Sequence, residues 1–190
     1  ENSNHWYYEV FKLLEENNIG WNFWTHKKVE KISSPYSAVV SPFYQTLIDY
    51  WSGDGSQPSA LYAEAALMSF ANSLKIENCI QLPGVIASLT DPEYGQISKP
   101  YRPHSIPGII SAAEYDIGAR GRSYHDSDYY NNGDGTYNEG WTFRNDGVDI
   151  QQNQNTDGFP FNIGWTDIGE WIGYTINDVV AGTYNIKVRV

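Results

Sequence analysis

Tryptophan and tyrosine are the residue types in this sequence whose chemistry stands out. Aromatic residues make up 15% of the 190 residues, with 7 Trp and 15 Tyr. Each of these side chains combines a large flat apolar surface with one polar atom. Such surfaces suit stacking on sugar rings, whose C–H faces are apolar and whose edges carry hydroxyl groups. The alternative is that the aromatic side chains fill a β-rich core, so composition alone leaves both interpretations open.

The residues that usually form metal sites or activated nucleophiles show no such pattern. The four His are dispersed without ligand spacing, and no Ser lies in a Gly-x-Ser-x-Gly elbow. The lone Cys79 excludes an internal disulfide, and we expect it to be a small buried apolar side chain. Asp126, Asp128 and Asp134 lack the spacing and the closing Glu of an EF-hand, which favours a solvated turn.

The balance of charges excludes several classes of partner. The chain has 12 basic and 23 acidic residues, which gives a formal net charge of -11. A nucleic-acid binder needs a basic surface for phosphate contacts, and so does a protein that docks on anionic lipid. The sequence also lacks the run of about 18 apolar residues that a membrane-spanning helix requires. We therefore expect no nucleic-acid partner and no membrane insertion.

The first half of the chain has the pattern of helices around one short strand. Apolar residues at helical spacing predict a first helix with Asn4 as its N-cap. The dense aromatic and β-branched run 19–25 predicts a strand. Ser41, which precedes a proline, predicts the start of a second helix. The Ala-rich stretch 59–74 predicts a third helix, and residues 84–89 a further helical turn.

The second half of the chain has a different pattern. Residues 91–107 contain four prolines and little apolar periodicity, which predicts a semi-extended linker. Residues 108–190 combine short alternating runs with many Gly, Asn and Asp, and turn clusters recur at 131–135 and 145–147. This pattern is typical of a β-sandwich or jelly roll.

The stretch ENSNHWYYEVFKLLEENNIGWNFWTHKK resembles the end of the catalytic barrel of glycoside hydrolase family 5. IGWNFWT followed by HKK resembles the eighth strand and the loop after it, and SPFYQTLIDYW resembles the eighth helix. In that family a Trp at the end of this strand stacks under the sugar. The resemblance therefore implies that Trp24 binds substrate, with His26 and Lys27 hydrogen-bonding its hydroxyls. The alternative is a core aromatic beside a solvated basic loop. Trp21 has the opposite parity, so we expect it to pack against helices.

Five stretches in order across 107–190 resemble carbohydrate-binding module family 6: IPGIISAAEYDIG, SYHDSDYYNNGDG, FRNDGVDI, FNIGWTDIGEWIGYTI and AGTYNIKVRV. The resemblance implies a jelly roll that binds sugar in loops at its rim. FRNDGVDI matches a motif that usually begins with Tyr-Arg, so Phe143 takes the stacking position and Trp141 is an alternative platform. We expect Trp171 in the core. Glu170 either ties down a loop or contacts ligand.

The catalytic carboxylates of family 5 have no counterpart that we can assign. Retaining hydrolysis uses a nucleophile and an acid/base about 5 Å apart, and the family carries these two Glu at the ends of its fourth and seventh strands. Nothing matches the fourth strand. Glu1 opens the chain near the seventh, but it lies too close to the first helix and to Trp24, so we expect the nucleophile upstream. We therefore assign no catalytic residue and expect no cofactor for catalysis.

Structural calcium is frequent in the module family, but one departure from the family pattern puts the site in doubt. The first strand of the family often has two Glu around an Ala, where this chain has Ser111 and Ala113. Glu114 lies one position later and would face the other side of a strand. The metal site is left open.

These inferences give one expected organisation. Residues 1–90 form the C-terminal piece of a (β/α)8 barrel, residues 91–106 a linker, and residues 107–190 an incomplete β-sandwich jelly roll. The fold class is thus α/β followed by all-β. The parent would be a secreted glycoside hydrolase, extracellular or at the cell surface, acting on β-glucan-type polysaccharide, and this chain alone would be inactive. The alternative is a non-catalytic polysaccharide-binding protein whose sandwich is the functional part.

Overall fold

The chain forms two compact units, which we describe separately. The computed structural model describes residues 3–127, 143–154 and 158–189. The smaller unit is Asn22–Leu82, and the larger unit comprises the described residues up to Trp21 and from Pro83 onward. This division follows contacts and not sequence relatedness, so the three expected family segments stay a prediction.

A three-stranded sheet forms one part of the smaller unit. Strand β1 (Lys27–Val29) pairs in parallel with β2 (Tyr36–Ala38), and β2 pairs antiparallel with β3 (Ile80–Gln81). The strand predicted at 19–25 is wrong, because none of these residues lies in a strand. A strand needs a neighbour to pair with and a surface to pack on, and the aromatic composition of this run supplies neither.

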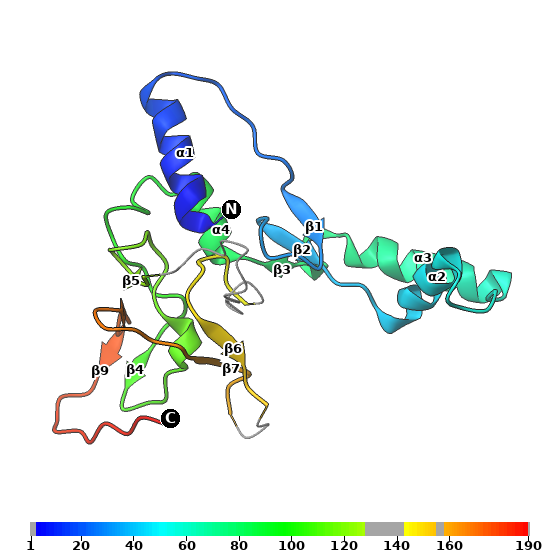
Figure 1. Cartoon of the computed structure of the whole chain (residues 1–190). Coiled ribbons are helices and arrows are strands. Elements are labelled where there is room, and N and C mark those ends of the chain that lie inside the picture. Colours follow the sequence, from blue (N-terminus) through cyan, green and yellow to red (C-terminus); the bar gives the residue numbers. More distant parts are fainter. Residues whose placement is uncertain (1–2, 128–142, 155–157, 190) are drawn as a thin grey trace. The chain divides into compact units, whose positions relative to one another are not determined.

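The other part of the smaller unit is a pair of helices, α2 (Pro42–Ser52) and α3 (Ala60–Ser73), which lie side by side (Figure 1). Both predicted starts are confirmed. The hydroxyls of Ser41 and Ser59 each accept a hydrogen bond, of 3.2 Å, from the backbone N–H three residues later. These caps satisfy donors that a helix leaves unpaired at its N-terminus, which is why the two positions could be predicted from sequence.

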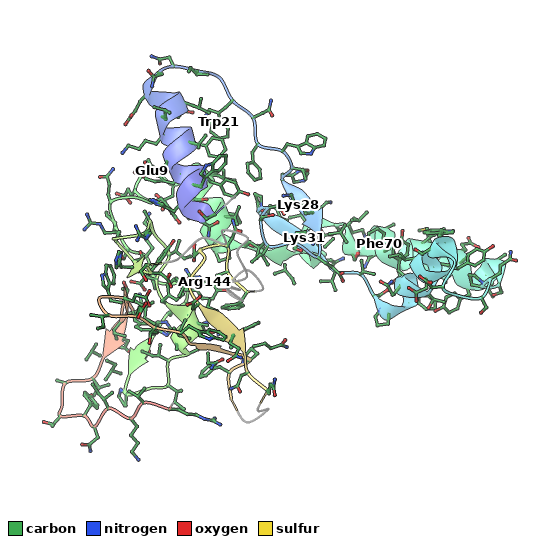
Figure 2. The ribbon with its side chains drawn as sticks, viewed as in Figure 1. Glu9, Trp21, Lys28, Lys31, Phe70 and Arg144 are labelled. Atoms are coloured by element: carbon green, nitrogen blue, oxygen red, sulfur yellow. The ribbon has the colours of Figure 1, made fainter. Side chains whose placement is uncertain are left out.

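Aromatic side chains fill the space between α2 and α3. Tyr44 stacks on Phe70 with ring centroids 4.1 Å apart and planes inclined by 8°, and Figure 2 labels Phe70 in this group of side chains. Leu47 and Ala66 are fully buried there. After the short 3-10 helix η1 (Ile76–Asn78), Cys79 is a free thiol that is half-buried, so its predicted full burial is wrong.

The larger unit begins with helix α1 (Asn4–Glu16), which packs against α4 (Pro83–Thr90) (Figure 1). The N-cap of α1 is Ser3, and the prediction of Asn4 is wrong by one residue. The Ser3 hydroxyl accepts a hydrogen bond of 3.1 Å from the N–H of Trp6. Asn4 is the first helical residue, and its side chain donates a hydrogen bond to Asp146 instead of capping the helix. The helical turn predicted at 84–89 is confirmed by α4.

Three strand pairs follow in the larger unit. Among the described residues, each sheet has two or three strands, and none closes into a barrel. The predicted fold class stays a prediction. The pairs are β4 (Ser105–Ile106) with β9 (Asp178–Val179), parallel; β5 (Tyr124–His125) with β8 (Trp171–Ile172), antiparallel; and β6 (Ile150–Gln152) with β7 (Phe161–Ile163), antiparallel. A 3-10 helix, η2 (Ala112–Glu114), precedes β5.

The predicted linker is in contact with the rest of the larger unit. Tyr94 is 1% exposed and forms a buried cluster with Ile117 and Ala119. The backbone groups of Lys99 and Ile117 exchange two hydrogen bonds, of 2.9 and 2.7 Å. Residues 92–96 of this stretch form hydrogen-bonded turns, so the predicted semi-extended course is wrong there, and the contacts of Tyr94 and Lys99 fix the backbone.

The main core of the larger unit encloses an ion pair between Arg144 and Asp146, with Arg144 labelled in Figure 2. The guanidinium Nε donates a hydrogen bond of 2.8 Å to Oδ2 of Asp146, and the guanidinium carbon lies 3.6 Å from the centroid of the Tyr115 ring. The hydroxyls of Tyr115 and Tyr124 donate to the carboxylate and the carbonyl of Asp146 at 3.2 and 3.1 Å. Burial raises the pKa of both tyrosines well above the ordinary value, so they remain neutral donors.

Candidate functional site

The turn between β7 and β8, residues 164–170, is fixed by the carboxylate of Glu170. Oε1 accepts hydrogen bonds from the backbone N–H and the hydroxyl of Ser127, at 2.8 and 2.7 Å. Oε2 accepts a bond of 2.7 Å from the N–H of Asp167. Of the two roles that the sequence left open for Glu170, these bonds support tying down a loop.

The same bonds set the charge state of Glu170. Burial raises the pKa of this carboxyl, but the hydrogen bonds from Ser127 and Asp167 outweigh burial and lower the pKa below its ordinary value. The group is therefore an anion at neutral pH, which strengthens the bonds that it accepts.

Two indoles stand at the ends of this turn, and both meet solvent. Trp165 is 59% exposed and Trp171 is 44% exposed, so the expectation that Trp171 lies in the core is wrong. The backbone of Trp165 has φ of +44°, a left-handed conformation that residues other than Gly rarely adopt. Gly169 also has a positive φ, of +94°, which glycine adopts without steric cost. The turn thus presents flat apolar rings on a fixed backbone.

Phe143, the sequence-based candidate for a stacking platform, contacts the core. Its ring stacks on Phe161 with centroids 4.5 Å apart and an interplanar angle of 24°, and the centroid of Tyr101 lies 5.9 Å away. One face of Phe143 is therefore occupied within the larger unit. Its binding role stays a prediction. Trp141, the alternative platform, lies outside the described residues, and so does Glu1.

In the smaller unit, Trp24 is 87% exposed. His26, two residues later, is exposed as well, and its carbonyl accepts a hydrogen bond of 3.2 Å from the N–H of Tyr36. The ammonium of Lys27 donates to the carbonyl of Leu74. Of the three predicted substrate-binding residues, Trp24 therefore has a large solvent-exposed ring surface, whereas the ammonium group of Lys27 already donates a hydrogen bond within the unit.

Trp21 belongs to the larger unit and packs against helix α1, as predicted. Its ring lies on Phe11 with centroids 4.1 Å apart, and its Nε1 donates a bond of 2.6 Å to Glu15.

The residues considered for calcium are engaged in other contacts where the structure describes them. Ser111 and Ala113 bring no carboxylate, and the carboxylate of Glu114 forms an ion pair of 2.9 Å with Arg102. The backbone N–H of Asp149 donates to Oδ2 of Asp126 at 3.4 Å. Asp128 and Asp134 lie outside the described residues. Within the described ranges, no group of three or more His, Cys, Asp or Glu is arranged to hold a metal ion.

Sequence reasoning missed the turn at 164–170 as a candidate site. The available signal was the pair of glycines, Gly164 directly before Trp165 and Gly169 two positions before Trp171. Glycine favours turns, and turns usually lie at the protein surface, so each indole adjoins a stretch that is expected to meet solvent.

None of three comparisons, with protein-family models, with curated proteins and with solved structures, found a match for this chain. In the part of the chain that the structure describes, no helix is both long and apolar enough to cross a membrane.

Proposed function

We propose that this chain binds β-glucan-type polysaccharide as part of a secreted glycoside hydrolase that acts with retention of configuration. One observation carries the binding part. Trp165 and Trp171 present large exposed ring surfaces at the two ends of a turn that Glu170 holds in place. Secretion and the retaining reaction rest on the sequence resemblance.

The physical argument for binding is one of preorganisation. A solvent-exposed indole keeps apolar surface in water, and stacking on the apolar face of a sugar removes that surface from water. A turn that is already fixed loses little conformational freedom when a ligand binds. Each stacked ring can then contribute on the order of 1 kcal/mol.

Trp24 supports the same proposal in the smaller unit. An indole that is 87% exposed has surface available for a sugar ring, and the exposed His26 nearby in sequence offers a hydrogen-bonding group. In the proposed function Trp24 is the stacking residue of the hydrolase part, with His26 and Lys27 as its polar neighbours. Phe143 and Trp141 remain secondary candidates in the module.

Affinity electrophoresis against laminarin, barley β-glucan and carboxymethylcellulose tests the proposal. We expect the wild-type chain to be retarded by at least one glycan, and Trp165→Ala and Trp171→Ala each to weaken binding by roughly fivefold or more. Trp51→Ala is the matched control, because Trp51 on α2 is also 59% exposed. Equal retardation of all variants, or no retardation of the wild type by any glycan, would contradict the proposal.

A second candidate is a polysaccharide-binding protein without catalysis. The exposed rings of Trp165 and Trp171 favour it, because they are stacking surfaces and no pair of catalytic carboxylates has been assigned. The sequence upstream in the reading frame separates the two candidates. A barrel with a Glu near each of two strand ends supports the hydrolase, and about two hundred preceding residues without a barrel would favour the binding protein.

A further inference from the structure

The first residue of helix α1 is joined to the buried ion pair of the larger unit. Nδ2 of Asn4 donates a hydrogen bond of 2.7 Å to Oδ1 of Asp146. The two residues are 1% and 2% exposed, respectively. Arg144 and Tyr115 both donate to the other carboxylate oxygen, Oδ2. The amide of Asn4 therefore supplies Oδ1 with a donor inside the core.

Asn145, which lies between Arg144 and Asp146 in the sequence, also forms hydrogen bonds with Asn4. The backbone N–H of Asn4 donates a hydrogen bond of 2.8 Å to the carbonyl of Asn145. Nδ2 of Asn145 donates a bond of 3.2 Å to Oδ1 of Asn4. The N-terminus of α1 is thus attached to the segment 144–146 through both backbone and side-chain atoms.

Two glycines make room for α1 at this position. A Cβ atom at Gly84, in α4, would lie 2.7 Å from Nδ2 of Asn4. A Cβ atom at Gly95 would collide with the hydroxyl of Tyr8. The Tyr8 ring in turn packs on the buried Tyr94, with centroids 5.4 Å apart. The first two turns of α1 therefore pack closely against the rest of the unit. A residue larger than glycine at position 84 or 95 would obstruct this packing.

We propose that α1 is a strap that closes the larger unit, because its docking completes the hydrogen bonding of Asp146 and holds the segment 144–150 in place. Undocking α1 would leave a buried carboxylate oxygen without this donor, which is costly. The strap and the segment therefore open and close together. The smaller unit is then an insertion between two helices, α1 and α4, that pack against each other. This inference is independent of what the unit binds.

Amide hydrogen exchange of the full chain tests the strap. We expect Asn4→Ala to accelerate exchange about tenfold or more both in α1 and in the residues 144–150, since a hydrogen bond to a buried charge is lost. Asn17→Ala is the matched control at the exposed C-terminal end of α1, and it should leave 144–150 unchanged. Faster exchange confined to α1, or no change in either segment, would overturn the proposal.

A second variant keeps the test informative where Asn4→Ala fails to fold. Gly84→Ala does not change Asn4, but its added Cβ atom would collide with the Asn4 side chain. We therefore expect this variant to accelerate exchange in the same two segments, although Ala favours a helix more than Gly does. Gly20→Ala is the control, because a Cβ atom there meets nothing within 4 Å. Unchanged exchange in Gly84→Ala would overturn the proposal.

Cutting the chain gives an independent measurement. A specific protease site inserted after Asn18 allows α1 to be separated from the rest of the folded protein. If α1 is a docked strap, the released helix co-elutes with the remainder in native size-exclusion chromatography and separates only in denaturant. Elution of the helix on its own under native conditions would contradict the strap.

Discussion

The rings of Phe143 and Phe161 stack 4.5 Å apart, with planes inclined by 24°. This pair joins Phe143, the residue before the buried Arg144, to strand β7, and both rings pack against the core that includes Tyr115 and Ile150. A residue that the sequence suggests as a rim platform therefore contributes to the packing of the larger unit.

Replacing Phe143 by Ala should consequently affect folding. We expect the free energy of unfolding to fall by about 1–3 kcal/mol, below the full cost of a completely buried Phe because Phe143 is half-buried. Denaturant titration measures this change. Phe159→Ala serves as the control, since Phe159 is exposed. A Phe143→Ala variant with wild-type stability and reduced glycan binding would contradict this packing role and support Phe143 as a binding platform.

The bonds made by Glu170 predict a dependence on pH. The pKa of this carboxyl is lowered in the folded protein, so its contribution to the turn is present above the ordinary value of 4.5 and is lost as the pH falls through the lower folded pKa. We expect glycan binding to decline in this acid range. In Glu170→Gln the turn should already be loosened at pH 7, with weaker binding and no further decline of this origin. Identical acid profiles of the variant and the wild type would exclude the mechanism.

The buried ion pair predicts a large loss of stability when one partner is removed. Arg144→Met leaves the Asp146 carboxylate buried without its cation, which we expect to cost about 3–5 kcal/mol. Arg122→Met, at an exposed position, should change the melting temperature little. Thermal unfolding followed by circular dichroism compares the two variants. A small shift for Arg144→Met would show that water reaches the site.

The C-terminal segment predicts self-association. Every second residue from Tyr184 to Val188 is apolar or aromatic, and Tyr184, Ile186 and Val188 are exposed. None of the residues 182–189 lies in a strand. Such a segment has backbone groups and an apolar face available for pairing with another chain. We expect Ile186→Lys to reduce association in analytical ultracentrifugation, whereas Asn185→Lys adds the same charge to the alternate face and should have less effect. Equal effects of the two variants would show that charge, and not the apolar face, controls association.

The helices were the part of the fold that the sequence predicted well. The starts of α2 and α3 follow from Ser41 and Ser59, because capping is a local interaction between residues three positions apart. The strand predicted at 19–25 depended on a partner strand, which a local pattern cannot supply.

The exposure of single aromatic residues was harder to predict. Trp171 was expected in the core and is exposed, because burial depends on residues distant in sequence, as the contact of Phe143 with Phe161 also shows. The role of Asn4 could not be predicted either, since its partner Asp146 is 142 positions away. The signal for the turn at 164–170 was local, namely its two glycines.

The most direct test of polysaccharide binding by the 164–172 region uses the indole N–H groups themselves. The chain has 7 Trp, so a sample labelled with nitrogen-15 at Trp should give one indole resonance for each, assigned by single Trp→Phe variants. On titration with β-glucan oligosaccharides we predict that the resonances of Trp165 and Trp171 shift in a saturable way, while that of Trp51 stays in place. Saturable shifts confined to other tryptophans, or no shift with any oligosaccharide, would contradict the account.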